Sequence, residues 1–315
     1  MNSNKPQKTG VSTVEIGPAQ LGQRLDNFLF KHLQNVPRTR VYRIIRKGEV
    51  RVNKKRCKPE YKLEAGDVVR IPPIQLEPVS DGKPQPPASL LKQLEDRTLF
   101  QNPHLIIVDK PAGVAVHAGS GVSFGVIDAM RALHPDEDIE LVHRLDRDTS
   151  GCLVLARHRQ ALLTLQRLMR DDSLHKQYIA VVRGNWPNHL TSIDLPLRKY
   201  HMTNGERRVR VDRAGKWASS RVQLLQGGSR YSIIRVELVT GRTHQIRVHC
   251  QSQGHEIAGD DKYGNSEFNR DMRKRGLRRL LLHAASLELP QTDYTPEIVI
   301  NAPLPDEFES LMTSS

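Results

Sequence analysis

The sequence predicts an α+β protein with two domains, and three observations support this. The chain has 315 residues, more than the roughly 100–200 residues of a usual single domain. The stretch SDGKPQP at 80–86 is rich in proline, glycine and polar residues, which is typical of a solvated connector. Strand-like and helix-like segments alternate on both sides of it. We therefore expect a flexible tail at 1–17, a small domain at 18–76, a linker at 77–97 and a large domain at 98–315.

The composition favours a polyanionic partner. Lys and Arg number 48 against 35 Asp and Glu, so the formal charge is +13, which suits nucleic acid or an anionic membrane surface. No apolar run approaches the roughly 18–20 residues needed to span a bilayer, and the first residues, MNSNKPQKTG, do not resemble a signal peptide. We therefore expect a cytoplasmic protein without a membrane partner. The three cysteines, Cys57, Cys152 and Cys250, are far apart and indicate neither a disulfide framework nor a zinc site.

One helix of the small domain is expected to be apolar on one side and cationic on the other. Helical spacing groups three apolar residues on one stripe and three basic residues on another face. The apolar residues are Val41, Ile44 and Ile45, and the basic residues are Arg40, Arg43 and Lys47. After it, Val50 and Val52 alternate with charged residues as in a strand. Between Arg24 and Arg70 the sequence holds fourteen Lys and Arg against five Asp and Glu, a net charge of +9.

The segments RLDNFL, VYRIIRKGEVRVN and LEAGDVV in this domain resemble the S4-type RNA-binding domain. The resemblance implies a small helix-and-sheet module that holds RNA phosphates. The expected contacts are the cationic helix face and the loop that adjoins it, with Lys54, Lys55 and Arg56. A merely solvated basic face is the alternative that the charges by themselves leave open.

The large domain is expected to contain a large sheet. The β-branched run at 105–108 reads as a strand, and 178–182 is apolar at every position, which predicts a central strand covered on both faces. Apolar residues recur with helical spacing at 126–133 and again at 162–169, and 231–239 returns to strand-like composition.

The most informative stretch is HRLDRDTSG at 143–151, a charged, turn-forming segment between two apolar runs. Its turn-forming residues predict that Asp146 is presented from a loop at a strand end. Arg144 and Arg147 flank Asp146, and nearby cations favour the charged form of a carboxylate, so we expect it to be ionised at neutral pH. Asp148 is interpreted as a turn residue. From these residues alone, a structural ion pair is the alternative to a catalytic carboxylate.

HRLDRDTSG resembles the catalytic motif of the RluA-type pseudouridine synthases. Three more stretches match this family in the same order: KPAGVAVH at 110–117, KQYIAVVRG at 176–184 and TGRTHQIRVH at 240–249. One departure is Glu256, where the family commonly has proline, which puts a loop conformation in doubt. The resemblance implies the pseudouridine-synthase fold, a large mixed and mainly antiparallel sheet with flanking helices and a central cleft.

The resemblance also implies roles for individual residues. It makes Asp146 the catalytic carboxylate, Tyr178 the surface on which a flipped-out uracil rests, and Arg247 the ion-pair partner of Asp146. It further implies that Arg242 contacts RNA nearby and that Arg144 fills the space that the flipped base leaves. Without the resemblance, Tyr178 reads as a core residue and each arginine as a surface charge. Arg247 also lies early in a helix expected between Thr243 and Gly254, where an anion is favoured.

The predicted function is isomerisation of specific uridines in 23S ribosomal RNA by a monomer. Uridine isomerisation requires no redox partner or group donor, so no cofactor is expected. The histidines lack the spacing of a zinc site, so no metal is expected either; they are His143, His244, His249, His255 and His283. The alternatives are a non-catalytic S4-domain protein of RNA binding or ribosome assembly, a member of the same family that acts on transfer RNA, and a hydrolase that releases uracil.

Overall fold

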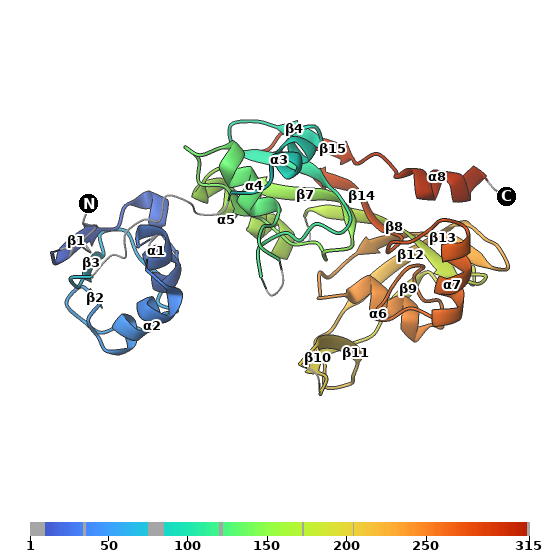
Figure 1. The fold of residues 1–315 in the computed structure, drawn as a ribbon, viewed down its shortest axis with the longest axis horizontal. Helices are drawn as coiled ribbons and strands as arrows, with labels where there is room; N and C mark the ends of the chain where they lie inside the picture. The colour runs from blue at the N-terminus through green and yellow to red at the C-terminus, as the bar shows by residue number, and fades with distance from the viewer. Residues whose placement is uncertain are drawn as a thin grey trace, which may run out of the picture. The chain divides into compact units, whose positions relative to one another are not determined.

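The computed structural model describes residues 10–33, 36–74, 85–119, 122–171, 173–203 and 205–313. The chain forms two compact units, Met1–Gln85 and Pro86–Ser315, and each has a hydrophobic core of its own. Figure 1 shows the elements of both units along the chain. Within the described ranges, no helix is both long and apolar enough to cross a membrane.

The first unit packs short helices against a three-stranded sheet. Its strands lie in the order β1-β3-β2, and its elements are β1 (Ser12–Glu15), α1 (Leu25–His32), α2 (Arg38–Arg46), β2 (Arg51–Val52) and β3 (Val68–Ile71). The two faces predicted for α2 are confirmed. Val41, Ile44 and Ile45 are buried in the core, whereas Arg43 and Lys47 are exposed and Arg40, the third basic residue, is half-buried.

The prediction of a flexible tail at 1–17 is wrong for residues 10–17. Ser12–Glu15 forms β1, which pairs antiparallel with β3 and places Val14 opposite Val69. Ile16, the next residue, is buried. Val14 and Ile16 alternate with polar residues, but over so few positions that the strand period could not be recognised. Residues 1–9 of the expected tail lie outside the described residues.

The expected linker also needs a correction. Residues 77–84, most of its first half, lie outside the described residues, as do residues 75 and 76 at the end of the expected small domain. Near its end, however, the chain forms α3 (Ala88–Glu95), which belongs to the second unit. Leu94 of α3 is buried in the same core as α4 (Val126–Leu133). Leu90, Leu91 and Leu94 have helical spacing, a signal that the proline-rich composition before them obscured.

A ten-stranded sheet organises the second unit. The strands follow the order β4-β5-β7-β14-β8-β13-β12-β9, with β15 beside β14 and β6 beside β7. The first five in the chain are β4 (Thr98–Gln101), β5 (Leu105–Lys110), β6 (Glu140–Leu141), β7 (Ser150–Ala156) and β8 (His175–Arg183). The others are β9 (Ser192–Asp194), β12 (Ser219–Gln226), β13 (Tyr231–Leu238), β14 (Leu282–Leu289) and β15 (Ile298–Asn301). β7 and β14 pair in parallel and the other pairs are antiparallel, which confirms a mixed, mainly antiparallel sheet.

Helices cover both faces of this sheet, as the strand at 178–182 predicted. Tyr178, Ala180 and Val182 of β8 share a core with α3, α4 and α6 (Gln245–Ser252). Ile179 and Val181, on the opposite face, pack with α7 (Ser266–Lys274) and α8 (Asp306–Thr313), while α5 (Arg159–Arg170) covers that face beside β7. The central position of β8 between β14 and β13 is therefore confirmed.

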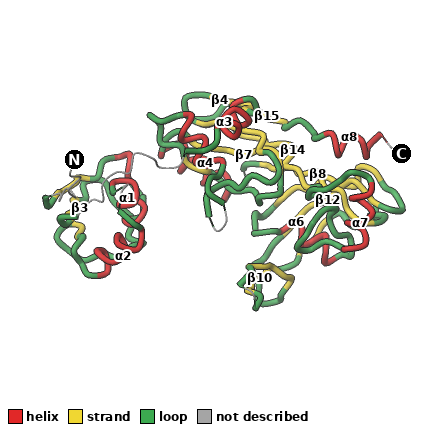
Figure 2. The backbone as a smooth tube through the Cα atoms, in the orientation of Figure 1, coloured by secondary structure: helices red, strands yellow, loops and turns green. Residues whose placement is uncertain are grey.

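A separate hairpin extends from the second unit. β10 (Leu197–His201) and β11 (Arg207–Val211) form a two-stranded sheet of their own, and Figures 1 and 2 show it projecting beyond α6, away from the large sheet. A lone two-stranded sheet is marginally stable in water. Its root is stabilised by a small apolar cluster of Leu197, Val209 and Ala218 with Val248 of α6 and Tyr263.

Candidate active site

Asp146 lies in the loop between β6 and β7, as the sequence predicts. The backbone N–H of Thr149 donates to the carbonyl of Asp146 at 3.2 Å, which closes a turn directly after it. Gly151 then adopts a φ of +106°, and a Cβ there would lie 2.2 Å from the carbonyl oxygen of Ala284 on the parallel strand β14. Only glycine fits this approach, so Gly151 lets the start of β7, where the loop ends, lie directly against β14.

A buried lysine ties this loop to the first motif of the domain. Lys110 is completely buried, and its Nζ donates to the carbonyls of Pro111, Val114 and Arg147 at 2.8, 2.8 and 2.9 Å. Three carbonyl oxygens match the three N–H donors of an ammonium group, although burial still lowers the pKa of Lys110 to about 7. The N–H of Gly113 donates to the same Arg147 carbonyl at 2.9 Å. The residue after Asp146 is thus fixed in position.

Arg247 joins two carboxylates. Its Nη1 donates to Oδ2 of Asp146 at 3.0 Å, while its Nε and Nη2 donate to the two oxygens of Asp260 at 2.7 and 2.8 Å. Asp260 also accepts the backbone N–H groups of Lys262 and Tyr263 at 2.9 and 3.0 Å. Burial would lower the pKa of Arg247, but its hydrogen bonds and the charges of Asp260 and Asp146 outweigh this and raise the pKa. Arg247 is therefore a fixed cation beside Asp146.

His244 faces the other oxygen of Asp146. Its Nε2 lies 3.7 Å from Oδ1 of Asp146, and its backbone adopts the left-handed region (φ 53°) at the start of α6. The hydroxyl of Tyr263 accepts the N–H of Val209 at 2.9 Å and lies 2.8 Å from Nδ1 of His244. Burial lowers the pKa of His244, so the ring is neutral at pH 7. With the Tyr263 hydroxyl donating to Nδ1, the ring proton is on Nε2 and points toward Asp146.

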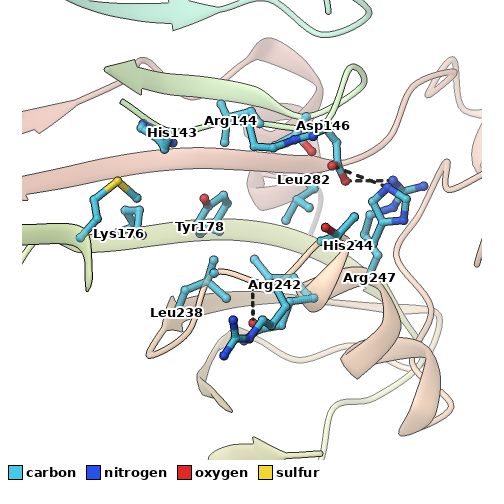
Figure 3. Close-up of a pocket in the computed structure, with 17 residues that line it drawn as sticks. His143, Arg144, Asp146, Lys176, Tyr178, Leu238, Arg242, His244, Arg247 and Leu282 are labelled. Atoms are coloured by element: carbon cyan, nitrogen blue, oxygen red, sulfur yellow. Dashed lines mark hydrogen bonds and ion pairs between the residues drawn. The ribbon is translucent and has the colours of Figure 1, made fainter. Parts of the chain in front are cut away.

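These groups border a cavity of about 310 Å³, within the range of small-ligand sites. Figure 3 shows Tyr178 and Leu282, from neighbouring strands, beside Asp146, and Arg247 and His244 across from its carboxylate. Burial and the charge of Asp146 raise the pKa of Tyr178, so its hydroxyl stays protonated. The cavity therefore combines an apolar, partly aromatic surface with one carboxylate.

Comparisons with known proteins agree with this geometry. Residues 104–252 match the family model described as RNA pseudouridylate synthase, and residues 23–69 match the S4 domain. The chain is 46% identical over 318 residues to ribosomal large subunit pseudouridine synthase C of Pasteurella multocida, covering 99% of this chain and 97% of the relative. The chain belongs to the RNA pseudouridylate synthase family. It is accordingly an RNA pseudouridine synthase with an S4 domain.

Two further comparisons extend over much of the chain. Ribosomal large subunit pseudouridine synthase C of Escherichia coli strain K12 is 47% identical over 303 residues, 95% of each chain. Among solved structures, human RNA pseudouridylate synthase domain containing 4 aligns with a TM-score of 0.58 and 27% identity over 71% of this chain and 95% of that one. The fold implied by the sequence motifs is thus confirmed.

The structure of this pseudouridine synthase brings the residues that the motifs singled out in the large domain around one cavity. Its lining includes Asp146, Tyr178, Arg247, Arg144 and Arg242. The expected ion pair between Asp146 and Arg247 is present. The side chain of Asp148 pairs with Arg147 at 3.2 Å instead of lining the described cavity, which agrees with a turn residue. The catalytic and RNA-binding roles themselves stay predictions.

Three groups of this site were missed from the sequence. Asp260 and Tyr263 occur in the segment GHEIAGDDKYG, which matches the synthase family but received no role, and His244 was considered for metals only. A buried arginine needs a carboxylate partner, so a buried Arg247 implies a second aspartate beside it. Nothing local in the sequence, however, shows that the segment after Gly259 returns to α6.

The departure from the synthase family at Glu256 has a structural counterpart. The backbone carbonyl of Glu256 accepts the N–H of Arg183 at 2.9 Å, and its carboxylate accepts from Nε of Arg183 at 2.6 Å. An ion pair thus fixes this loop to the end of β8.

The histidines of the motifs take part in hydrogen bonds of the fold. Nε2 of His143 accepts the N–H of Val154 at 3.1 Å, and Nδ1 of His283 lies 2.8 Å from Oγ of Ser150. Burial lowers the pKa of His143 to about 3 and that of His283 to about 4. Among the described residues, no three His, Cys, Asp or Glu side chains form a group that could hold a metal ion.

Acidification is therefore expected to destabilise the second unit. Both imidazoles are neutral when folded but protonate near pH 6.5 when unfolded, so the unfolded state binds more protons below that pH. The difference between the folded and unfolded pKa of each imidazole should lower the free energy of unfolding by roughly 2–3 kcal/mol at pH 4.5. Urea unfolding at pH 7 and pH 4.5 measures this. His143→Gln should show a smaller drop than the unmodified protein, and an equal drop would contradict the assignment.

Proposed function

We propose that this enzyme converts specific uridines of 23S ribosomal RNA to pseudouridine, with Asp146 as its catalytic carboxylate. One observation carries the proposal: the carboxylate of Asp146 is held by Arg247 at 3.0 Å and faces a cavity that Tyr178 lines. Ribosomal RNA is the substrate that the names of the relatives state, and the S4 domain favours an RNA ligand. This substrate also places the reaction in the cytoplasm.

The reaction needs little beyond one carboxylate. The bond between C1′ and N1 of the uridine breaks, the uracil turns over while it stays bound, and C5 forms a new bond to C1′. A proton leaves C5 and one is gained at N1, so no reagent is consumed. Asp146 either attacks the nucleoside or removes the 2′ proton to form a glycal, and both routes use an ionised carboxylate. A glycosidase differs because a second carboxyl group protonates a sugar that departs.

The two oxygens of Asp146 have different surroundings. Oδ2 accepts the hydrogen bond from Arg247, whereas Oδ1 faces His244 at the longer distance of 3.7 Å. Oδ1 is accordingly the oxygen we assign to the reaction. The bidentate contact of Arg247 with Asp260 keeps the cation in place without help from the substrate, which is the preorganisation that a charged reaction centre requires.

The target nucleoside is proposed to enter the cavity as a flipped-out base. A uridine in folded RNA cannot reach a carboxylate inside a cavity while it is stacked, and extruded bases rest on aromatic or apolar surfaces. Tyr178 and Leu282 supply such a surface beside Asp146. Arg144, exposed at the edge of the cavity, is proposed to fill the space that the base leaves in the RNA.

Basic side chains of both units are proposed to hold the RNA phosphates. In the first unit these are Arg40, Arg43, Lys47, Lys54, Lys55 and Arg56, and all except the half-buried Arg40 are exposed. In the second unit Arg242 lines the cavity and is exposed. Contacts of this kind position the RNA, while its shape selects the uridine.

The experiment is to incubate the protein with unmodified 23S ribosomal RNA transcript and to map pseudouridines by carbodiimide-induced stops of reverse transcription. Discrete new stops, unchanged RNA mass and no released uracil are expected. Transfer RNA transcripts serve as the parallel substrate. Stops in transfer RNA but none in the 23S transcript would overturn the proposed substrate, and free uracil would indicate hydrolysis instead of isomerisation.

A further inference from the structure

The hairpin β10–β11 and the turn after it carry a dense positive charge that the active site does not use. We call residues 197–203 and 205–217 the arm. It contains seven Lys and Arg against two acidic residues, a net charge of +5. Together with the net +9 between Arg24 and Arg70, this gives +14, whereas the formal charge of the whole chain is +13, so the other residues carry a net charge of −1. The excess charge is thus concentrated in two places, and one of them is the arm.

Most of this charge faces solvent and is not neutralised. Six basic side chains of the arm are exposed: Arg198, Lys199, Arg207, Arg210, Arg213 and Lys216. Asp212 lies 3.2 Å from Arg210 and 3.7 Å from Arg198, so one carboxylate serves two arginines. The other four make no ion pair with any residue that the structure describes.

The strand register makes this charge costly to the fold. Arg198 lies directly opposite Arg210, and Asp212 is the single carboxylate beside this pair of arginines. Like charges at facing positions of a strand pair destabilise it, and this hairpin is already a small sheet of its own. A purely structural hairpin would gain stability from mixed charges at these positions. A polyanion on this surface would remove the repulsion.

The arm is attached to the same elements that hold the catalytic groups. Val209 is buried against Val248, the residue after Arg247 on α6. The N–H of Val209 donates to the Tyr263 hydroxyl that contacts His244. Nη1 of Arg208 donates to the carbonyl of Lys262 at 2.9 Å, two residues after Asp260. The root of the arm therefore has a fixed position beside the cavity.

An exposed tryptophan marks the end of the arm next to the cavity. Trp217 is 57% exposed, and its carbonyl accepts from Nε of the cavity-lining Arg242 at 3.2 Å. Large exposed aromatic side chains beside arginine are typical of surfaces that stack unpaired nucleobases. A uridine bound at Asp146 remains covalently joined to its neighbours, so the RNA strand must leave the cavity past its edge.

We propose that the arm binds the RNA strand next to the target uridine, with its basic side chains on the phosphates and Trp217 stacked on an unpaired base. This rests on the proposed function in that the substrate is RNA. The arm adds a second RNA-binding surface to the S4 domain, located on the catalytic unit itself, and it holds the substrate where the reaction takes place.

The test neutralises three unpaired side chains of the arm at once, as Lys199→Gln, Arg207→Gln and Arg213→Gln. The matched control removes the same charge from three exposed side chains of α7, as Arg270→Gln, Arg273→Gln and Lys274→Gln. Affinity of the full chain for unmodified 23S transcript is measured at several salt concentrations. The arm variant should bind at least about 10-fold more weakly and lose about 2 from the slope of log affinity against log salt, while the control changes little. Equal behaviour of the two variants would overturn the proposal.

A second pair of variants tests the stacking. Trp217→Ala should weaken binding by about 5- to 100-fold, and Trp217→Phe should retain most of the affinity because it keeps an aromatic face. Unchanged binding of Trp217→Ala would refute the stacked base. Both pairs of variants are tested by their affinity for RNA and not by their activity. A failure to find pseudouridine in the mapping experiment would therefore count against the proposed function alone. Unchanged affinities together with successful mapping would count against RNA binding by the arm alone.

Discussion

Replacement of Asp146 with Asn is expected to abolish pseudouridine formation while RNA affinity stays nearly the same. Asparagine keeps the shape of the side chain and an oxygen that can accept from Arg247, but it can neither attack the nucleoside nor remove a proton. The single-turnover rate should fall by about 10⁴-fold or more. The same preparation should bind unmodified 23S transcript as well as the unmodified enzyme does, because the basic contacts on both units are untouched.

Asp148→Asn is the matched control for this prediction. It removes the same charge from the same loop, but Asp148 pairs with Arg147 and is not among the described residues that line the cavity. A surface change of this kind should alter the rate by no more than about two- to three-fold. Turnover by the Asp146 variant, or an equal loss in both variants, would show that the loop has been assigned the wrong carboxylate.

Much of the fold could be predicted where the signal is local. The helix α2 is buried on one face and the strand β8 on both faces. Burial on one or both faces dictates which positions are apolar, so the spacing of a few neighbouring residues predicts each of them. The loop of Asp146 could be located because turn-forming residues stand between two apolar runs. These features were confirmed in the structure.

The features that were missed depend on residues far apart in the chain. β7 pairs in parallel with β14, which places Gly151 against Ala284, and no local pattern at either position predicts this. Asp260 reaches Arg247 because the segment after Ile257 folds back against α6. The arm could have been recognised, since the net charge of 197–217 stands out in the sequence, but its position beside the cavity depends on the packing of Val209 and Tyr263.

The second large effect is expected from Arg247→Met, which should both destabilise the catalytic unit and slow the reaction. Asp260 is 2% exposed, and the variant leaves it as a buried carboxylate without its bidentate partner. Such a loss costs about 3–5 kcal/mol, which corresponds to a fall in Tm of roughly 6–20 °C for a unit of this size. Thermal unfolding and single-turnover kinetics measure the two effects separately. Arg247→Lys should restore little of the stability or the rate that Arg247→Met loses, because one ammonium group cannot make the planar contact with Asp260 and also reach Asp146.

A double variant separates the catalytic contribution of Arg247 from its structural one. Combining Arg247→Met with Asp260→Asn removes the unpaired charge, so most of the lost stability should return, since a neutral amide can still take up the N–H groups of Lys262 and Tyr263. The rate should remain low by about 10²-fold or more, because Asp146 still lacks the cation that holds its Oδ2. If the double variant regained activity together with stability, Arg247 would act only as a support for the fold, and the geometry around Asp146 would have to be maintained by His244 and the backbone of its loop.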